Sequence, residues 1–206
     1  MDDTIWNHAV FLKNRDRLLT SEVAQRFFAE VNRRAKRFLS DHHFTVDGTL
    51  IQAWASQKSF RAKDGSDDGN GTNLHGQKRS NETHESTTDS DTRLYKKGYG
   101  EESHLSYLAH ALGENRNGLI AAAIATTADS FAEREAALTM LEAQRKGRKR
   151  RITLGADKAY VSKGFGWLKE TGPLREVKLR GLHKIDWLFV FSCAAYNLCQ
   201  PPGLIA

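Results

Sequence analysis

Cysteine is scarce in this chain of 206 residues, which contains only two. Cys193 and Cys199 lie in one apolar stretch near the C-terminus and have no histidine or cysteine neighbours at the spacing of a zinc site. Unpaired cysteine packs as a small apolar side chain. The pattern therefore indicates reduced core thiols and suits a cytoplasmic protein.

The sequence also lacks an export signal and a membrane span. Its first residues, Met1-Asp2-Asp3, are acidic, whereas a signal peptide begins with basic residues. The most apolar run, 185–198, contains Asp186 and Asn197 and falls short of the roughly 20 residues needed to cross a bilayer. We expect this run to form a buried helix and the chain to have no contact with a membrane.

Aliphatic side chains are almost missing from 56–100, where small polar residues, lysine and histidine dominate. Such a composition cannot bury enough apolar surface to form a core of its own. The segment 56–101 is therefore predicted to be a flexible insertion. His75 and His84 lie in it at irregular spacing, which favours chance over a metal site.

Basic residues outnumber acidic ones, with 31 Lys+Arg against 25 Asp+Glu and a formal net charge of +6. This balance favours a polyanionic partner, and nucleic acid is the first candidate. The densest cluster, 145–151, holds six basic residues in seven positions. It is either a phosphate-contacting loop or a solvated connector, and the overall charge favours the former.

Apolar spacing predicts helices and strands in a mixed order. Between 5 and 39 it predicts a helical hairpin with a break at 20–22 and an arginine-rich face, which is either a phosphate track or a solvated surface. Strands are expected at 103–112 and 119–126, joined by turn residues at 113–118. A capping box at 130–133 opens a helix that runs to about Gln144, and the strand 152–157 follows.

A carboxylate stands inside the first expected strand, 43–49. If Phe44 and Val46 face a core, Asp47 faces the opposite side, and Gly48 lets another backbone or a ligand approach. Aspartate is depleted in strands and costly to bury unpaired, so this placement is typical of a metal-binding carboxylate. An edge strand that ends at Gly48 with a solvated aspartate is the alternative. A second carboxylate, Asp157, ends the strand 152–157, and two such carboxylates in one sheet are what two-metal phosphoryl transfer requires.

Four stretches together resemble the bacterial insertion-sequence transposases of family five, within the DDE superfamily. They are 44–51 (FTVDGTLI), 114–118 (ENRNG), 156–160 (ADKAY) and 164–169 (GFGWLK). The resemblance implies an α/β fold with a ribonuclease-H-like mixed sheet and flanking helices, incomplete here, over 41–206, after a helical N-terminal remnant over 1–40. It also implies that Asp47 and Asp157 are the first two catalytic aspartates and bind Mg²⁺ or Mn²⁺.

The implied activity is metal-dependent phosphodiester cleavage and strand transfer in DNA transposition, carried out by a cytoplasmic, nucleoid-associated bacterial protein that could form homo-oligomers. DNA is the implied partner. The residues expected to contact it are basic and lie in three segments: Arg145, Lys146, Arg148, Lys149, Arg150, Arg151, Lys163, Lys169, Arg175 and Lys178, with Arg180 and Lys184 as further candidates.

The chain departs from the family pattern at two places. Alignment on Lys169 puts Ser162 at the position of the family's catalytic glutamate, and the nearest acid, Glu170, lies on another face of a helix. Asp157 and Ser162 are only five positions apart, too close for the crossover that a further parallel strand needs. We therefore expect a truncated, internally deleted copy that is defective in cleavage. The alternative is a catalytically silent, DNA-binding transposase remnant.

Overall fold

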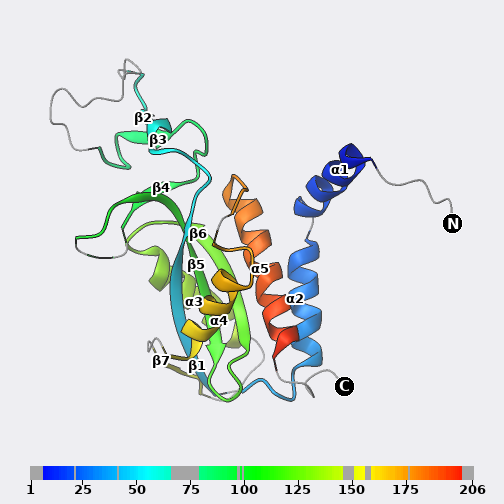
Figure 1. Ribbon diagram of the computed structural model, residues 1–206. Helices are drawn as coiled ribbons and strands as arrows, with labels where there is room; N and C mark the ends of the chain where they lie inside the picture. Colours follow the sequence, from blue (N-terminus) through cyan, green and yellow to red (C-terminus); the bar gives the residue numbers. More distant parts are fainter. Residues whose placement is uncertain are drawn as a thin grey trace.

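A mixed sheet with helices on both faces forms the centre of the computed structural model (Figure 1). The structure describes residues 7–20, 22–40, 42–65, 79–96, 98, 100–145, 151–155, 159–175 and 177–200. The helices are α1 (His8–Leu19), α2 (Val23–Arg34), α3 (Ala132–Arg145), α4 (Ala159–Glu170) and α5 (Leu182–Cys199), with the 3-10 turn η1 (Gln57–Ser59). The strands are β1 (His43–Gln52), β2 (Phe60–Ala62), β3 (His84–Ser86), β4 (Arg93–Tyr95), β5 (His104–Glu114), β6 (Ile120–Thr127) and β7 (Thr153–Gly155).

The main sheet has the order β4-β5-β1-β7, and β6 also pairs with β5. β1 is antiparallel to β5 over 44–52, whereas β7 runs parallel to β1 and pairs only with 43–45. The predicted hairpin of β5 and β6 is confirmed. The alternative of an edge strand that ends at Gly48 is wrong, because β1 continues to Gln52. From Val46 onward, β1 has no strand partner on its second edge within the described residues.

Alternating side chains of β1 serve two different cores, as the period of two in a strand requires. Phe44 packs with Ala136 and Met140 of α3 on one face. Ile51 packs on the other face with Phe165 of α4 and Phe189 of α5. The predicted buried helix is confirmed as α5. No helix in the described ranges combines the length and the apolar character that a membrane span would need.

The two cysteines of α5 differ in their surroundings. Cys193 is buried, and this burial raises the pKa of its thiol well above the ordinary value, so the thiol stays protonated. Cys199 is exposed at the end of the helix. The expectation of core thiols is therefore correct for Cys193 and wrong for Cys199, because Cys199 is the last residue of α5 and is exposed there.

The N-terminal helices do not form the expected hairpin. Both helices are present, with their break at 20–22, but α1 extends beyond the end of α2 rather than folding back along it (Figure 1). α2 lies along α5 instead, where Phe27 stacks on Phe191 with ring centroids 5.2 Å apart. The apolar surface of α5 thus takes the contact that the hairpin would have used, and Phe11 of α1 is left 63% exposed.

The described parts of the predicted flexible insertion are packed against the main body. β2 pairs with β3, β4 pairs with β5, and Phe60 is buried in the main core. His84 stacks on Phe60, and His75 lies outside the described residues. These parts correct the expectation of an unpacked segment, whereas 66–78 lie outside the described residues.

Hydrogen bonds attach this insertion to the start of α5. Asp89 Oδ1 accepts from the N–H of Gly181 at 3.2 Å and from the hydroxyl of Tyr107 at 2.7 Å. Asp91 Oδ2 accepts from the N–H of Leu182 at 2.9 Å. Two carboxylates thus bind backbone donors at a helix N-terminus, where the helix dipole favours negative charge. These polar contacts add to the apolar packing of Phe60 and Leu94 in holding this segment in place.

Glu114 organises the turn between β5 and β6. Its side chain is fully buried. Oε2 accepts from the backbone N–H groups of Ser40 and Arg116, and Oε1 accepts from those of Asn117 and Leu119, at 2.6 to 3.1 Å. The motif 114–118, one of the four that carry the family resemblance, therefore has a structural role in this chain.

Candidate functional site

Asp47 lies near the middle of β1, on the stretch of the strand that β7 leaves uncovered. Its side chain is half-buried, and Oδ1 accepts from the N–H of Gly48 at 2.8 Å. The carboxylate therefore lies against the backbone of its own strand. Asp47 sits opposite Ala111 of β5, so the antiparallel pairing fixes its position in the sheet.

A pocket of about 430 Å³ opens beside this stretch of β1. Its charged lining residues come from three elements: Asp47 from β1, Glu133 from α3 and Lys169 from α4. α3 and α4 lie on opposite faces of the sheet, so the pocket extends around the edge of β1 that has no strand partner among the described residues. It brings together two carboxylates and one cation that are far apart in the sequence.

Gly48 leaves the space in which Glu133 approaches the strand. A Cβ atom at Gly48 would lie 3.1 Å from Glu133 Oε1 and 3.5 Å from His110 Nδ1. The sequence predicted a close approach at this glycine, by another backbone or a ligand. The approaching group is instead a side-chain carboxylate.

Sequence reasoning missed Glu133 as a site residue because it assigned that side chain to a capping box. In the structure, Asp129 caps the helix: its Oδ1 accepts from the N–H groups of Phe131 and Ala132 at 2.7 and 2.8 Å. An acid in the first turn of a helix is ordinary on electrostatic grounds. No local signal distinguished Glu133 from such a residue.

His110 adds a buried neutral imidazole beside Gly48 and Glu133. It is opposite Gly48 in the sheet and fully buried, and its Nε2 shares a hydrogen bond of 2.9 Å with the hydroxyl of Thr126. Nδ1 has no hydrogen-bond partner within the described residues. Burial lowers the pKa of His110 to about 4, with Asp129 acting weakly against this shift. The ring is therefore uncharged at neutral pH.

The second predicted catalytic residue, Asp157, lies outside the described residues. The strand before it, β7, is the parallel neighbour of β1, with Gly155 opposite Thr45. The predicted adjacency of the two strands is therefore confirmed for their described parts. The closeness of the two carboxylates stays a prediction.

The predicted third ligand position lies in α4, as the resemblance implied for the family's glutamate. Ser162 occupies it. Glu170, the nearest alternative acid, is exposed at the end of α4 and is not among the residues that line the Asp47 pocket. The expectation that Glu170 points elsewhere agrees with this placement.

No protein-family model, curated protein or solved structure matches this chain. Its function therefore has to be inferred from the sheet, the pocket and the surface charges.

The donor chemistry of the Asp47 pocket fits one divalent cation. Mg²⁺ prefers oxygen ligands and is usually held by one or two carboxylates together with substrate phosphates and water. Asp47 and Glu133 would supply such oxygens from one pocket. Within the described residues, no group of three or more histidine, cysteine or acidic side chains could hold a metal ion. A cation here would therefore depend on substrate oxygens as well as protein.

The predicted DNA-contacting residues are distributed over several surfaces. Those that are described and exposed are Arg145, Arg151, Lys163, Arg175 and Lys178. Lys169 is only half-exposed and lines the Asp47 pocket. Lys146, Arg148, Lys149 and Arg150 lie outside the described residues. Among the described members of this set, Lys169 thus lies beside Asp47, and the other side chains are exposed elsewhere on the surface.

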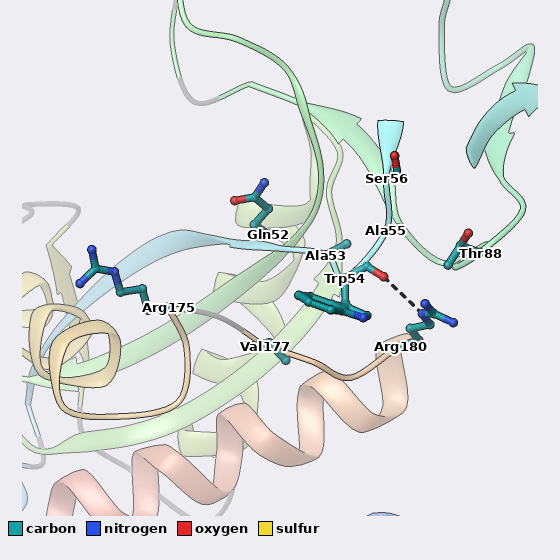
Figure 2. A pocket seen from close by; sticks show the side chains of 9 residues that line it. All are labelled: Gln52, Ala53, Trp54, Ala55, Ser56, Thr88, Arg175, Val177 and Arg180. Carbon is teal, nitrogen blue, oxygen red and sulfur yellow. Dashed lines mark hydrogen bonds between the residues drawn. The ribbon is translucent and has the colours of Figure 1, made fainter. Parts of the chain in front are cut away.

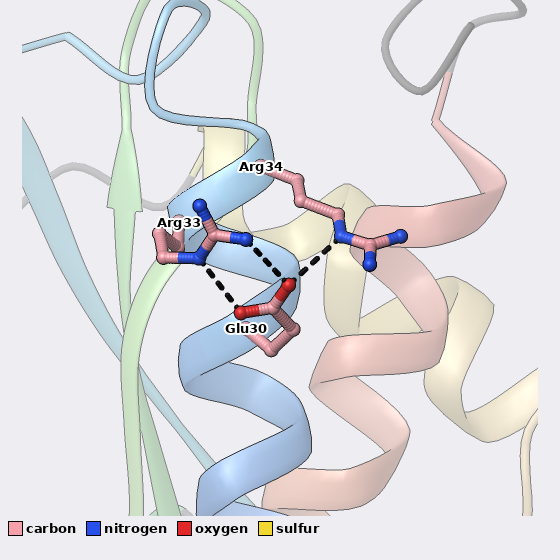
Figure 3. Close-up of polar contacts among 3 residues, drawn as sticks. All are labelled: Glu30, Arg33 and Arg34. Carbon is pink, nitrogen blue, oxygen red and sulfur yellow. Dashed lines mark hydrogen bonds and ion pairs between the residues drawn. The ribbon is translucent and has the colours of Figure 1, made fainter.

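The arginine-rich face of α2 is partly neutralised by an acid of the same helix (Figure 3). Glu30 accepts from Arg33 through both oxygens at 2.7 Å and from Arg34 Nε at 2.9 Å. These hydrogen bonds lower the pKa of Glu30 to about 2, so it is ionised at neutral pH. This arrangement favours the solvated-surface interpretation of α2 over a phosphate track.

Proposed function

We propose that this chain is a DNA-binding protein of the insertion-sequence transposase type, with a ribonuclease-H-like core and a defective cleavage site. The observation that carries the proposal is the position of Asp47 on a strand between an antiparallel hairpin and a parallel strand, at a pocket that also contains Lys169. The family resemblance implies a catalytic aspartate on the first strand of such a sheet. The order of β6, β5, β1 and β7, with α3 before β7, supports that assignment.

The surface charge supports DNA as the partner. Exposed lysine and arginine side chains bind phosphates through ion pairs that do not depend on base sequence. The chain has a net charge of +6, and five of the predicted contact residues are described and exposed. We therefore expect DNA binding without strong sequence preference.

Cleavage is expected to be lost. Two-metal phosphodiester cleavage requires ligands for both ions, and the family's third ligand is replaced by Ser162, whose hydroxyl carries no negative charge. Removal of a single charge-stabilising group typically costs on the order of 10²–10³ in rate. The shortened connection between Asp157 and α4 removes a further part of the family's core.

A duplex binding and nicking assay tests the proposal. We expect the purified chain to bind duplex DNA at low salt and to leave it uncut with Mg²⁺ or Mn²⁺, both as wild type and as Asp47→Asn. Absence of duplex binding would overturn the DNA-binding function. Cleavage that disappears in Asp47→Asn would show that the site is active.

A second candidate function is residual, single-cation nicking, and the approach of Glu133 to Gly48 favours it. A divalent cation bound by Asp47 and Glu133 would polarise a substrate phosphate, while Lys169 would hold the same phosphate by its charge. The neutral His110 ring beside Gly48 has a buried nitrogen that finds no hydrogen-bond partner in the part of the chain that the structure describes.

Glu133→Gln tests this candidate, with Glu135→Gln as the matched control, since both acids are exposed in the first turn of α3. Nicking in Mn²⁺ that is lost in Asp47→Asn and in Glu133→Gln, but kept in Glu135→Gln, supports it. Equal nicking by Glu133→Gln and wild type would rule it out.

A further inference from the structure

A second pocket, of about 640 Å³, lies at the far end of β1 (Figure 2). It is formed by 52–56 at the end of the strand, Thr88 of the insertion, and the segment before α5. It shares no lining residue with the Asp47 pocket. Its volume is in the range of pockets that hold small ring-containing ligands.

Trp54 is the aromatic side chain of this pocket, and it is 48% exposed. Its position is fixed through the backbone, because Arg180 Nε donates to the carbonyl oxygen of Trp54 at 3.2 Å (Figure 2). Lys178 Nζ lies 5.5 Å from the centroid of the indole ring, a cation–π distance. The indole is therefore held at the pocket while about half of its surface remains accessible.

The charged residues that line this pocket are both arginines, Arg175 and Arg180, and Lys178 adds a third cation at the indole. All three are exposed. An accessible aromatic ring next to several cations matches a ligand that combines a flat ring with negative charge. Nucleotides in a single strand have this chemistry, and proteins bind them by stacking bases on aromatic side chains along a basic groove.

We propose that this pocket binds an unpaired base of single-stranded DNA, with the base stacked on Trp54 and the flanking phosphates contacted by Arg175 and Lys178. Only an unpaired base exposes its ring face, because paired bases are stacked within the duplex. Gln52 and Ser56 supply polar groups for the edge of the base. This inference goes beyond the proposed function, because it assigns the pocket around Trp54 to an unpaired base rather than to the phosphates of duplex DNA.

The test compares single-stranded and duplex binding of the full chain by fluorescence anisotropy at one salt concentration. The single-stranded probe is an oligothymidylate of about 15 nucleotides, and Trp54→Ala should weaken its binding about 5- to 100-fold. Trp54→Phe should keep most of the affinity, because phenylalanine retains a stacking face. Duplex binding should change less than about twofold in both variants, because paired bases do not reach the ring.

Two controls separate stacking from general effects. Phe11→Ala removes another exposed aromatic ring, and Arg17→Gln removes an exposed charge, both on α1 away from the pocket; each should leave oligothymidylate binding unchanged, whereas Arg175→Gln should weaken it. Thermal melting shows whether Trp54→Ala is folded, and Trp54→Leu, which keeps an apolar side chain without a ring, provides the same comparison if it is not.

Three results would overturn the inference. They are equal loss of single-stranded and duplex binding in Trp54→Ala, unchanged oligothymidylate binding in that variant, and tighter binding of oligouridylate than of oligothymidylate. Absence of duplex binding by the wild type would contradict the proposed function instead. Failure of this inference and failure of the proposed function are therefore distinguishable.

Discussion

Several polar side chains in this protein are buried where water cannot reach them, and each needs a partner or a neutral state. Glu114 satisfies four backbone N–H groups. His110 keeps one nitrogen paired and stays uncharged. Burial of an unpaired polar group costs free energy, so these residues should control stability.

His110 predicts an acid-sensitive contribution to stability. Its pKa is about 4 in the folded protein, against 6.5 for an unperturbed histidine. As the pH falls from about 6.5 to 4, the unfolded chain takes up a proton that the folded chain does not, so the free energy of unfolding falls. The loss should reach about 3 kcal/mol at the lower end of this range.

Urea unfolding at a series of pH values measures this effect. The decline between pH 6.5 and pH 4 should be smaller in His110→Gln, which has no titrating ring. Identical pH profiles for the variant and the wild type would contradict this assignment.

Glu114→Gln should destabilise the protein by about 2–4 kcal/mol, because an amide presents one acceptor oxygen where the carboxylate presents two. The two N–H groups at the other oxygen would face an NH₂ group. Glu102→Gln, an exposed change just before the start of β5, is the control and should be close to neutral. Chemical denaturation of the two variants makes the comparison, and equal midpoints would refute it.

At the scale of helices and strands, local patterns predicted the elements well and their partners poorly. The β5–β6 hairpin follows from alternation and from turn residues at 113–118, which are neighbours in sequence. The position of α2 does not follow from local patterns, because its apolar face contacts α5, which lies about 160 residues later in the sequence. Glu133 was missed for the same reason, since only the packing of α3 beside Gly48 gives it a role.

The attachment of the insertion to α5 gives a prediction at this scale. Asp89→Asn should destabilise the protein by about 1–3 kcal/mol, because it weakens the hydrogen bonds from Tyr107 and Gly181. Amide hydrogen exchange should increase in the first turn of α5. Glu101→Gln, an exposed change in the same insertion, should leave both measurements unchanged. Unaltered exchange at 181–185 in Asp89→Asn would count against this attachment.

At the scale of the whole molecule, the exposed cations predict salt-dependent DNA binding. If all five described contact residues reach phosphates, affinity should fall about 500-fold between about 50 and 200 mM salt. Arg145→Gln should reduce the slope of log affinity against log salt by about 0.9, whereas Arg17→Gln on α1 should not change it. Anisotropy titrations provide the slopes, and a flat salt dependence would exclude phosphate-driven binding.

The contact between Asp89 and α5 also limits how early the insertion can fold while the chain is being synthesised. Asp89 and Gly181 are 92 residues apart. A ribosome that adds about 5–20 residues per second makes the glycine about 5–18 s after the aspartate. During that interval the insertion has been synthesised but the start of the helix that it caps has not. The native arrangement of this segment therefore forms only after the start of α5 has been synthesised, and chaperones that bind nascent chains would meet the insertion before its partner exists.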